Sequence, residues 1–300
     1  MRTISVFIDG QEGTTGLQIA ERLEALPWVH LTAIDPALRK DKEARQKRIG
    51  AADAVFLCLP DTAARESVSL CENPDTVILD ASTAHRTHPD WAYGFPELSP
   101  GHRQAIETGN RIAVPGCHAS GFCALVYPLR QKKLLGASDR LSCTSLTGYS
   151  GGGKVLIAEF EGEAPPRGGL PYALGLAHKH LPEMQAVCGL EHPPIFQPSL
   201  VPVKQGMLVS VPLPMDAGMI HQALSGWYAE AAGQVSVKPL NAMDALENGR
   251  LNMEALNGTD QMEIFVFGDK RQALMLARFD NLGKGASGAA AECLRIRFGR

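Results

Sequence analysis

The sequence predicts an α/β domain followed by a second domain of mixed α+β type. Three observations support this prediction. In the first part of the chain, nearly continuous apolar runs alternate with helical stretches, which is typical of a parallel sheet covered on both faces. A glycine-rich turn, DGQEGTTG, directly follows the first of these runs. After residue 117 the pattern changes to longer strands joined by proline-rich connections.

The first domain is predicted from an ordered series of short segments. The run TISVFID (3–9) has strand character, and the apolar spacing of LQIAERLEAL (17–26) suits an amphipathic helix. A second strand is expected at HLTAID (30–35), before a charged segment at 39–48. The remaining strands of this sheet are expected at AVFLCLP (54–60), TVILDAS (76–82) and RIAVPGC (111–117).

The second domain is predicted to begin with a helix near Cys117 that continues through SGFCALVYPLR. Three hundred residues exceed the size at which a single core stops growing, so two domains are expected, at 1–116 and 117–280. A terminal helix rich in small residues is expected within 280–295. The other elements are predicted as strands at 140–150, 207–215, 262–269 and 272–280 and a helix at 221–232.

Composition and charge exclude several classes of protein. A net charge of −3, with both signs spread along the chain, argues against a nucleic-acid partner. The opening MRTISVFIDG is too short an apolar run for a signal peptide or a membrane span. Seven cysteines at irregular spacing fit neither a secreted disulfide framework nor a structural zinc site. These observations predict a cytoplasmic protein with free thiols and no membrane partner.

The turn DGQEGTTG places glycines at positions 10, 13 and 16 between a strand and a helix. Glycines there let the main chain approach a pyrophosphate, and the helix N-terminus favours its negative charge. The turn therefore predicts a dinucleotide site, although its spacing differs from the usual GxGxxG. Asp35 is placed to bind a ribose hydroxyl and favours NAD, whereas Arg39 and Lys40 are placed to bind a 2′-phosphate and favour NADP.

Cys117, in VPGCHASG, stands at the end of a predicted strand and the start of a helix. A helix N-terminus favours the thiolate, and the carboxyl edge of a parallel sheet is the usual place for chemistry, so Cys117 is predicted to be a nucleophile. The other cysteines lie in or beside apolar runs and are expected to act as small hydrophobic residues; these are Cys58, Cys71, Cys123, Cys143, Cys188 and Cys293.

A nucleophilic thiol needs an acid/base partner, and the segment AHKHLPEM offers His178 and His180. The nearby Glu183 is a carboxylate able to orient an imidazole. In an extended chain the two histidines would face opposite ways, so only one is expected to face the thiol. His118 is a competing candidate, but it adjoins Cys117 and is expected to point elsewhere. No third ligand at convincing spacing supports a metal site.

Two segments are candidate anion or oxyanion sites. In SGGGK (150–154) the glycines can turn several N–H groups toward one oxygen, and Lys154 adds charge. In STAHR (82–86) the guanidinium of Arg86 can bind a carboxylate or a phosphate in a bidentate manner. Five other histidines, including the one within STAHR, are expected on the surface or in loops; these are His85, His88, His102, His192 and His221.

The ordered set of motifs DGQEGTTG, LCLPD, LDASTAHR, WAYGFPEL, VPGCHASG, TGYSGGGK, HKHLPEM and DNLGKGASG resembles the short (type 2) form of N-acetyl-gamma-glutamyl-phosphate reductase, over nearly the whole chain. The resemblance implies a Rossmann NADP-binding domain, completed by the terminal helix at 281–300. It also implies an α+β catalytic and oligomerisation domain like that of glyceraldehyde-3-phosphate dehydrogenase. Homodimers or homotetramers are expected from the family.

The resemblance also assigns roles to particular residues. Cys117 would be the nucleophile, and His180, or alternatively His178, the acid/base residue. The implied cofactor contacts are Gly10, Gly13, Thr14, Thr15, Gly16, Asp35, Arg39, Leu59, Pro60, Ser150, Gly151, Asn281 and Lys284. The implied substrate contacts are Ser82, Arg86, Gly152 and Lys154. Longer members of the family read NPGCYP at the cysteine, so Val114 and His118 depart from that pattern and leave the oxyanion donor open.

The implied reaction is NADPH-dependent reduction of N-acetyl-gamma-glutamyl phosphate to the semialdehyde through a thioester on Cys117, with release of phosphate, in arginine biosynthesis. Two alternatives are kept. The first is a reductase of aspartyl phosphate, because aspartate-semialdehyde dehydrogenases share the glycine turn and the KGA segment. The second is a nucleotide-binding regulator that has lost the reaction, against which the presence of Cys117, the histidine pair and the SGGGK segment weighs.

Overall fold

The computed structural model describes residues 2–229 and 233–300. The chain divides into two compact units. Unit 1 comprises residues 1–96, 100–115 and 286–300, and unit 2 comprises residues 97–99 and 116–285. The last three residues of the predicted helix at 221–232 lie outside the described residues.

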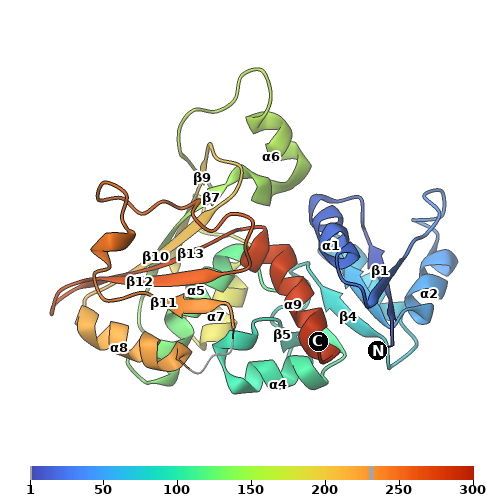
Figure 1. Cartoon of the computed structure of the whole chain (residues 1–300), viewed down its shortest axis with the longest axis horizontal. Helices are drawn as coiled ribbons and strands as arrows, with labels where there is room; N and C mark the ends of the chain where they lie inside the picture. Colours follow the sequence, from blue (N-terminus) through green and yellow to red (C-terminus); the bar gives the residue numbers. More distant parts are fainter. Residues whose placement is uncertain (1, 230–232) are drawn as a thin grey trace. The chain divides into compact units, whose positions relative to one another are not determined.

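Unit 1 contains a parallel sheet of six strands in the order β2-β1-β3-β4-β6-β5, shown in blue and cyan in Figure 1. All of its strand pairs are parallel. The strands are β1 (Ile4–Asp9), β2 (Val29–Thr32), β3 (Ala54–Leu57), β4 (Val77–Asp80), β5 (Ala92–Tyr93) and β6 (Arg111–Ala113). The predicted parallel sheet is confirmed.

Helices cover both faces of this sheet, as the apolar runs predicted. One core joins strand residues such as Val6 and Phe56 to Ile19 of α1 and Leu294 of α9, and the other joins Phe7 and Val55 to helix residues on the opposite face. The helices are α1 (Thr14–Glu24), α2 (Lys42–Ala51), α3 (Asp61–Ser69), α4 (Pro100–Thr108) and α9 (Gly288–Arg297). The predicted terminal helix is therefore present as α9.

Unit 2 contains a mixed sheet of seven strands in the order β11-β12-β13-β10-β7-β9-β8. Neighbours in its centre are antiparallel, while β7–β9 and β11–β12 are parallel pairs. The strands are β7 (Ser142–Gly148), β8 (Leu170–Pro171), β9 (Ile195–Val201), β10 (Met207–Leu213), β11 (Val235–Val237), β12 (Met262–Gly268) and β13 (Ala273–Phe279). The α+β prediction for this part is confirmed.

The longest helix of unit 2, α5 (Cys117–Gln131), packs against the middle of the sheet, and α8 (Ala217–Tyr228) lies beside it (Figure 1). A Cβ added at Gly121 would lie 2.5 Å from the Val209 side chain of β10, so glycine lets the first turns of α5 approach the strands closely. The other helices are α6 (Gly153–Phe160) and α7 (Leu181–Cys188). Short helical turns occupy Pro96–Leu98, Tyr149–Gly152, Met243–Ala245 and Gly283–Ser287.

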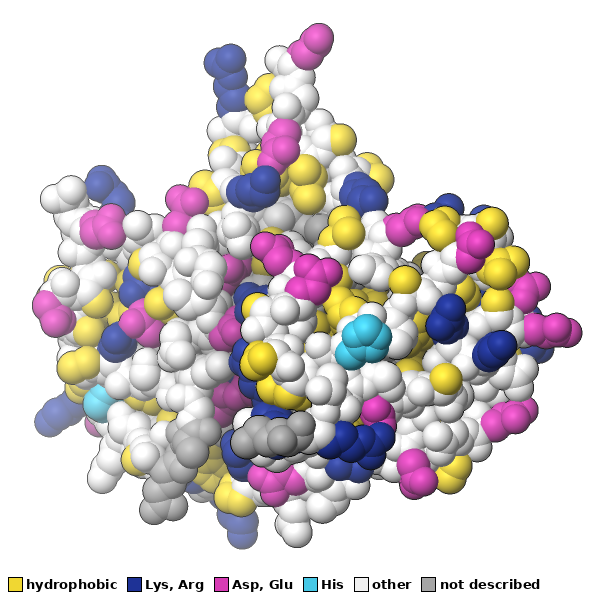
Figure 2. Space-filling model, turned by 45° about the vertical axis from the view of Figure 1, so that its right-hand side comes forward, with side chains coloured by type: hydrophobic (Ala, Val, Ile, Leu, Met, Phe, Trp, Pro, Cys, Tyr) yellow, Lys and Arg dark blue, Asp and Glu magenta, His cyan; other side chains and the backbone are white. Residues whose placement is uncertain are grey.

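Two features of the surface bear on possible partners. Figure 2 shows basic and acidic side chains interspersed on the face drawn, as expected from the mixed charges along the chain. In the part of the chain that the structure describes, no helix combines the length and the apolar character needed to cross a bilayer.

Candidate active site

Cys117 is the first residue of α5 and directly follows the Pro115–Gly116 break. Its side chain is half-buried. The first turn of α5 carries no acidic side chain, and Gly116 at the N-cap offers no capping side chain, so the helix N-terminus is free to favour a negative charge on sulfur. A Cβ added at Gly285 would lie 3.0 Å from the Cys117 Cβ, which shows that the main chain at Gly285 passes close to Cys117.

Glu183, on the first turn of α7, holds the main chain next to the thiol. The Gly116 N–H donates to its Oε1 at 2.9 Å, across 67 residues of sequence, and the side chain is buried. The sequence suggested that this carboxylate orients an imidazole. That role stays a prediction, and the structure shows that the carboxylate fixes the position of the loop from which Cys117 projects.

His178 and His180 lie just before and at the N-cap of α7. The chain turns there, with the Leu181 N–H bonded to the His178 carbonyl, so the extended geometry that would separate the two rings does not apply. Their ring centroids are 4.8 Å apart, and they lie 5.3 and 5.5 Å from the ring of His118. Both histidines therefore gather beside the residue that follows Cys117.

His178 and His118 are held in their neutral forms. Burial, with the positive charge of Lys179, lowers the pKa of His178 to about 4. Burial, with the charges of His178 and Lys179, lowers the pKa of His118 to about 3. The His180 N–H donates to Nδ1 of His178 at 3.1 Å, which requires that nitrogen to be unprotonated.

His118 points away from the start of α5 into a small polar cluster. Its Nδ1 is 2.8 Å from the Ser145 hydroxyl on β7, and its Nε2 is 2.8 Å from the Tyr172 hydroxyl, just after β8. Sequence reasoning missed both partners. Ser145 carried a weak signal, since it is a polar residue on the buried face of a predicted strand, whereas nothing in the sequence around Tyr172 indicated this role.

The remaining cysteines have surroundings that suit inert thiols. Four of them are fully buried and Cys58 and Cys71 are half-buried. Burial and the nearby carboxylates of Asp80 and Asp9 raise the pKa of Cys58 to about 12, and burial alone raises the pKa of Cys143. Their environments agree with the expectation that they serve as small hydrophobic residues.

The SGGGK segment forms the turn at Tyr149–Gly152 and the start of α6. Asn281 donates through Nδ2 to the Ser150 hydroxyl at 3.1 Å, and its Oδ1 accepts from the Gly206 N–H at 2.9 Å. Ser150 and Asn281, two predicted cofactor contacts that are 131 residues apart in sequence, thus lie together. Gly151, Gly152 and the side chain of Lys154 are exposed or partly exposed around them, and Gly153 has a φ of +74° that favours glycine.

Lys284 has a buried carboxylate partner. Its ammonium group is 2.6 Å from Oε1 of Glu97, and both side chains are at most 2% exposed. The same oxygen accepts from the Gln234 N–H at 3.2 Å. The charge of Lys284 is therefore balanced inside unit 2, and its assignment as a cofactor contact stays a prediction.

In unit 1 the glycine turn has the steric character of a phosphate-binding cradle. Gly10 has a φ of +88°, and a Cβ there would lie 2.5 Å from the Cys58 carbonyl oxygen. A Cβ at Gly16 would lie 2.6 to 2.7 Å from three main-chain atoms of the turn, whereas one at Gly13 would make only ordinary contacts. Thr14 and Thr15 open α1, whose first turn carries no acidic residue. These features fit a nicotinamide dinucleotide, with its pyrophosphate on the turn.

The other predicted cofactor contacts of unit 1 follow β2 and β3, and two of them, Leu59 and Arg39, contact the glycine turn. Leu59 reaches the space beside Gly10, and Pro60 is the N-cap of α3. β2 ends at Thr32, earlier than predicted, so Asp35 lies in the exposed loop after it and accepts from the Ala37 N–H at 2.9 Å. Arg39, on the same loop, forms an ion pair with Glu12 of the glycine turn, which brings its guanidinium to the cofactor turn.

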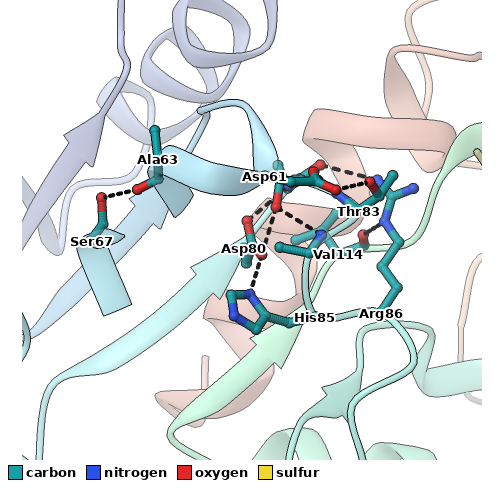
Figure 3. A network of polar contacts seen from close by, with 11 residues as sticks. Asp61, Ala63, Ser67, Asp80, Thr83, His85, Arg86 and Val114 are labelled. Carbon is teal, nitrogen blue, oxygen red and sulfur yellow. Dashed lines mark hydrogen bonds and ion pairs between the residues drawn. The ribbon is translucent and has the colours of Figure 1, made fainter. Parts of the chain in front are cut away.

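Asp80, the last residue of β4, and Arg86 lie in a polar network (Figure 3). Ser82 belongs to the same network through its bond to Asp80. The Ser82 hydroxyl donates to Asp80 at 2.8 Å, and Arg86 donates to the carbonyls of Val114 and Ala81 at 2.9 and 3.0 Å. Arg86 thereby binds main-chain carbonyls of unit 1, including that of Val114 three residues before Cys117. Its predicted contact with substrate stays a prediction.

His85 lies in this loop, as expected, but it is buried. Its Nδ1 is 2.6 Å from the Asp80 carboxylate, and its ring stacks on Trp91 with centroids 4.1 Å apart. Within residues 2–229 and 233–300, no three His, Cys, Asp or Glu side chains are grouped closely enough to hold a metal ion.

Comparison with known families gives two matches. Residues 35–107 match the NAD-binding domain of semialdehyde dehydrogenases, and residues 117–281 match the dimerisation domain of semialdehyde dehydrogenases. The second match alone covers more than half of the chain, and the first indicates that unit 1 binds a nicotinamide cofactor.

Comparison with individual proteins gives more specific relatives. The chain is 42% identical to N-acetyl-gamma-glutamyl-phosphate reductase 2 of Nostoc, over 100% of this chain and 98% of that protein. It is 44% identical to N-acetyl-gamma-glutamyl-phosphate reductase of Burkholderia lata, over 98% of this chain and 96% of that protein. Among solved structures, aspartate semialdehyde dehydrogenase II of Vibrio cholerae is similar with a TM-score of 0.70 at 16% identity, over 99% and 98% of the two chains, which shows the shared fold.

Proposed function

Because this chain belongs to the N-acetyl-gamma-glutamyl-phosphate reductase family, we propose that it reduces N-acetyl-gamma-glutamyl phosphate to N-acetylglutamate semialdehyde, with NADPH as reductant and release of phosphate, in arginine biosynthesis. The observation that carries the proposal is the half-buried thiol of Cys117 at the N-terminus of α5, with His178 and His180 packed against the next residue. A thiol, a helix N-terminus and neutral imidazoles are the parts that acyl transfer to sulfur requires.

The first half of the reaction transfers the acyl group to sulfur. His180 accepts the Cys117 proton, and the thiolate attacks the carbonyl carbon of the acyl phosphate. A carbon–sulfur bond forms, the carbon–oxygen bond to phosphate breaks, and the departing phosphate takes the proton from His180. Glu183 contributes by fixing the Gly116 main chain, which keeps the sulfur at the helix end during this exchange.

The second half reduces the resulting thioester. NADPH, when bound on the glycine turn of unit 1, supplies the hydride that the acyl carbon accepts. The thiohemiacetal oxyanion then collapses, the carbon–sulfur bond breaks, the aldehyde leaves as a thiolate is released on Cys117, and one proton from solvent restores the thiol for the next cycle. Holding the acyl group on sulfur protects an easily hydrolysed substrate and converts the reduction into a step within one complex.

NADP is proposed in preference to NAD because basic side chains follow β2. Arg39 and Lys40 would bind the 2′-phosphate, and the ion pair of the Arg39 guanidinium with Glu12 of the turn supports this proposal. A 2′-phosphate would take the place of the Glu12 carboxylate. Arg39→Gln is expected to weaken NADP binding while leaving NAD binding unchanged.

Self-association is proposed through the second domain, because residues 117–281 match a dimerisation domain. We propose a homodimer or a homotetramer. The molar mass of the purified chain in solution, measured by light scattering against the monomer mass of 32.2 kDa, tests this proposal.

The deciding experiment is phosphate-dependent reduction of NADP by the purified protein, with N-acetylglutamate semialdehyde and aspartate semialdehyde offered separately. Turnover with the first substrate alone is expected. Turnover with the second alone would keep the chemistry and refute the substrate assignment. Absence of turnover with both, in protein that binds NADPH, would favour a regulatory nucleotide-binding role.

A further inference from the structure

A buried polar network in unit 1 joins α2 to the residue that directly precedes the glycine turn. Arg45 of α2 donates through Nη2 and Nε to Oδ2 of Asp9, the last residue of β1, at 3.0 and 3.3 Å. The same guanidinium donates to the hydroxyl of Ser67 and, through Nη1, to Glu66 at 3.0 Å, both on α3. Arg45 is 7% exposed and Asp9 is 5% exposed. One arginine of α2 thus binds groups of β1 and α3.

This network is more than a source of stability. The attraction within a buried ion pair is largely offset by the desolvation of both ions, so such a pair is weak evidence for stability. The guanidinium, however, is a rigid planar fork that keeps its proton in proteins, and here it binds three side chains at once. Arg45 therefore has little freedom to move relative to the strand and the helix that it contacts.

The partner of Arg45 on β1 is fixed by the sheet. The main chain of Asp9 lies in register with Leu57 of β3, and the Cys58 N–H donates to the Asp9 carbonyl at 2.8 Å. The Asp9 carboxylate also accepts from the Ser67 hydroxyl at 2.7 Å. The end of β1 and the turn after it are thus held without Arg45, and it is α2 that the ion pair places against them.

The loop 35–41, which precedes α2, is tied to Arg45 by consecutive main-chain hydrogen bonds. The Leu38 N–H donates to the Asp35 carbonyl, and the Asp41 N–H donates to the Leu38 carbonyl, both at 2.8 Å. The Arg45 N–H donates in turn to the Asp41 carbonyl at 3.1 Å. Because each turn is bonded to the next, the position at which Arg45 is held determines the position of this loop.

The loop 35–41 carries Arg39 and Lys40, the side chains proposed above to bind the 2′-phosphate. In the structure Arg39 pairs with Glu12 of the glycine turn, but both side chains are largely exposed. A 2′-phosphate that replaces Glu12 would break this surface link between the loop and the turn. The buried contact of Arg45 involves no group that the phosphate would displace, so it persists when the cofactor is bound.

We propose that Arg45 is a positioning residue for cofactor selection. By binding Asp9 it holds the loop 35–41 where Arg39 and Lys40 reach the 2′-phosphate of a dinucleotide bound on the glycine turn. The inference rests on the proposed use of NADPH, but it concerns binding and needs no turnover. Loss of Arg45 should therefore weaken the binding of NADPH and spare that of NADH, whereas an ion pair that only stabilised the fold would affect both cofactors equally.

The test compares the Kd values of NADPH and NADH, titrated into the full-length enzyme at one pH and one ionic strength and followed by nicotinamide fluorescence. The wild type is expected to bind NADPH more tightly. Arg45→Met is expected to raise the Kd for NADPH about tenfold, as for partial loss of a hydrogen bond between charged groups, and the Kd for NADH by less than about twofold.

Arg278→Met is the matched control. Arg278 is also 7% exposed and also pairs with a carboxylate, that of Glu263, but it lies in unit 2 on β13. Its loss is expected to leave the ratio of the two Kd values unchanged.

Arg45→Lys gives a second measurement if Arg45→Met does not fold. A lysine keeps a positive charge beside Asp9, but its ammonium group cannot reproduce the planar fork that binds β1 and α3 together. This variant is expected to raise the Kd for NADPH by about threefold and to leave the Kd for NADH unchanged.

A combined variant tests whether Arg45 acts through the loop. In an Arg39→Gln/Lys40→Gln background the groups that Arg45 positions are gone, so adding Arg45→Met is expected to change the Kd for NADPH by less than about twofold. A further tenfold loss in that background would overturn the inference.

The remaining outcomes separate the inference from the function on which it rests. Arg45 variants that keep the wild-type ratio of the two Kd values, or that raise both values equally, would refute the role of Arg45 and leave the use of NADPH standing. A wild type that does not distinguish the two cofactors would refute the proposed preference for NADPH and this inference with it.

Discussion

The glycine turn of unit 1 and the thiol site of unit 2 are built from different kinds of groups. The turn is predicted to bind its ligand through main-chain N–H groups, and Gly10 and Gly16 matter because the space that a side chain would need is filled by main-chain atoms. Around His118, the residue after Cys117, the groups are side chains, and they come from segments far apart in sequence, such as β7 for Ser145 and the end of β8 for Tyr172. One site depends on local conformation and the other depends on tertiary packing.

This difference predicts that the two sites can be damaged independently. A bulky residue in the turn should weaken cofactor binding and leave the reactivity of the thiol intact. A substitution near the thiol should change its chemistry and leave cofactor binding intact.

The largest effect is expected for Cys117→Ser. A serine hydroxyl is a much weaker nucleophile than a thiolate, and kcat is expected to fall by about a thousandfold or more. NADPH binding, measured by the change in nicotinamide fluorescence, is expected to stay within about twofold of the wild-type value, because the turn lies in unit 1. A folded variant with near wild-type turnover would remove Cys117 from the mechanism.

The next effect is expected for Lys284→Met. This change leaves the Glu97 carboxylate buried without its ammonium partner, and breaking such a pair costs about 3–5 kcal/mol of unfolding free energy. Arg103→Gln is the control, because it breaks an exposed pair with Glu107 worth about 0.3–0.5 kcal/mol. Urea denaturation measures the unfolding free energy of both variants. A stable Lys284→Met protein with weakened NADPH binding would instead make Lys284 a cofactor contact.

A pH effect of intermediate size is expected from His118. Its pKa is near 3 in the folded protein against 6.5 for an exposed histidine, so below pH 6.5 the unfolded chain binds a proton that the folded chain does not. The unfolding free energy is therefore expected to fall by about 3 kcal/mol from pH 6.5 to pH 4. His178, with a pKa near 4, acts in the same direction. In His118→Gln the fall should be smaller; an equal fall would assign it to other groups.

The same contrast explains what could be predicted from the sequence. Five of the six strands of unit 1, the glycine turn and the helix beginning at Cys117 follow from short local patterns, and the structure contains them, whereas the two-residue strand β5 was not predicted. Other elements gave no local signal. β9 contains Pro198, a residue that argues against a strand in the sequence, although in the structure β9 pairs in parallel with β7 along its whole length. The segment of α3 consists mostly of polar and small residues, so its sequence did not indicate a helix.

The site around Cys117 shows more clearly that local sequence patterns do not reveal contacts between distant segments. The thiol and the two histidines of AHKHLPEM were predicted because each lies in a distinctive motif. Their partners were not, since the pairing of Ser145 with His118 and the bond from Gly116 to Glu183 depend on how distant strands and helices pack. Burial of His85 against Asp80 and Trp91 was missed for the same reason.

The smallest effect, and the sharpest comparison within one site, is expected at the glycine turn. A Cβ at Gly16 would come within 2.6 to 2.7 Å of main-chain atoms that cannot move aside cheaply, so Gly16→Ala should distort the turn at a cost of about 1–3 kcal/mol. That cost corresponds to an increase in the Kd for NADPH of about five- to a hundredfold.

Gly13→Ala is the matched control, because its Cβ would meet its nearest neighbours at 3.5 and 3.9 Å. It should bind NADPH nearly as the wild type does, and alkylation of Cys117 should be unchanged in both variants. Equal losses of NADPH binding in the two variants would mean that the turn depends on flexibility rather than on close main-chain approach.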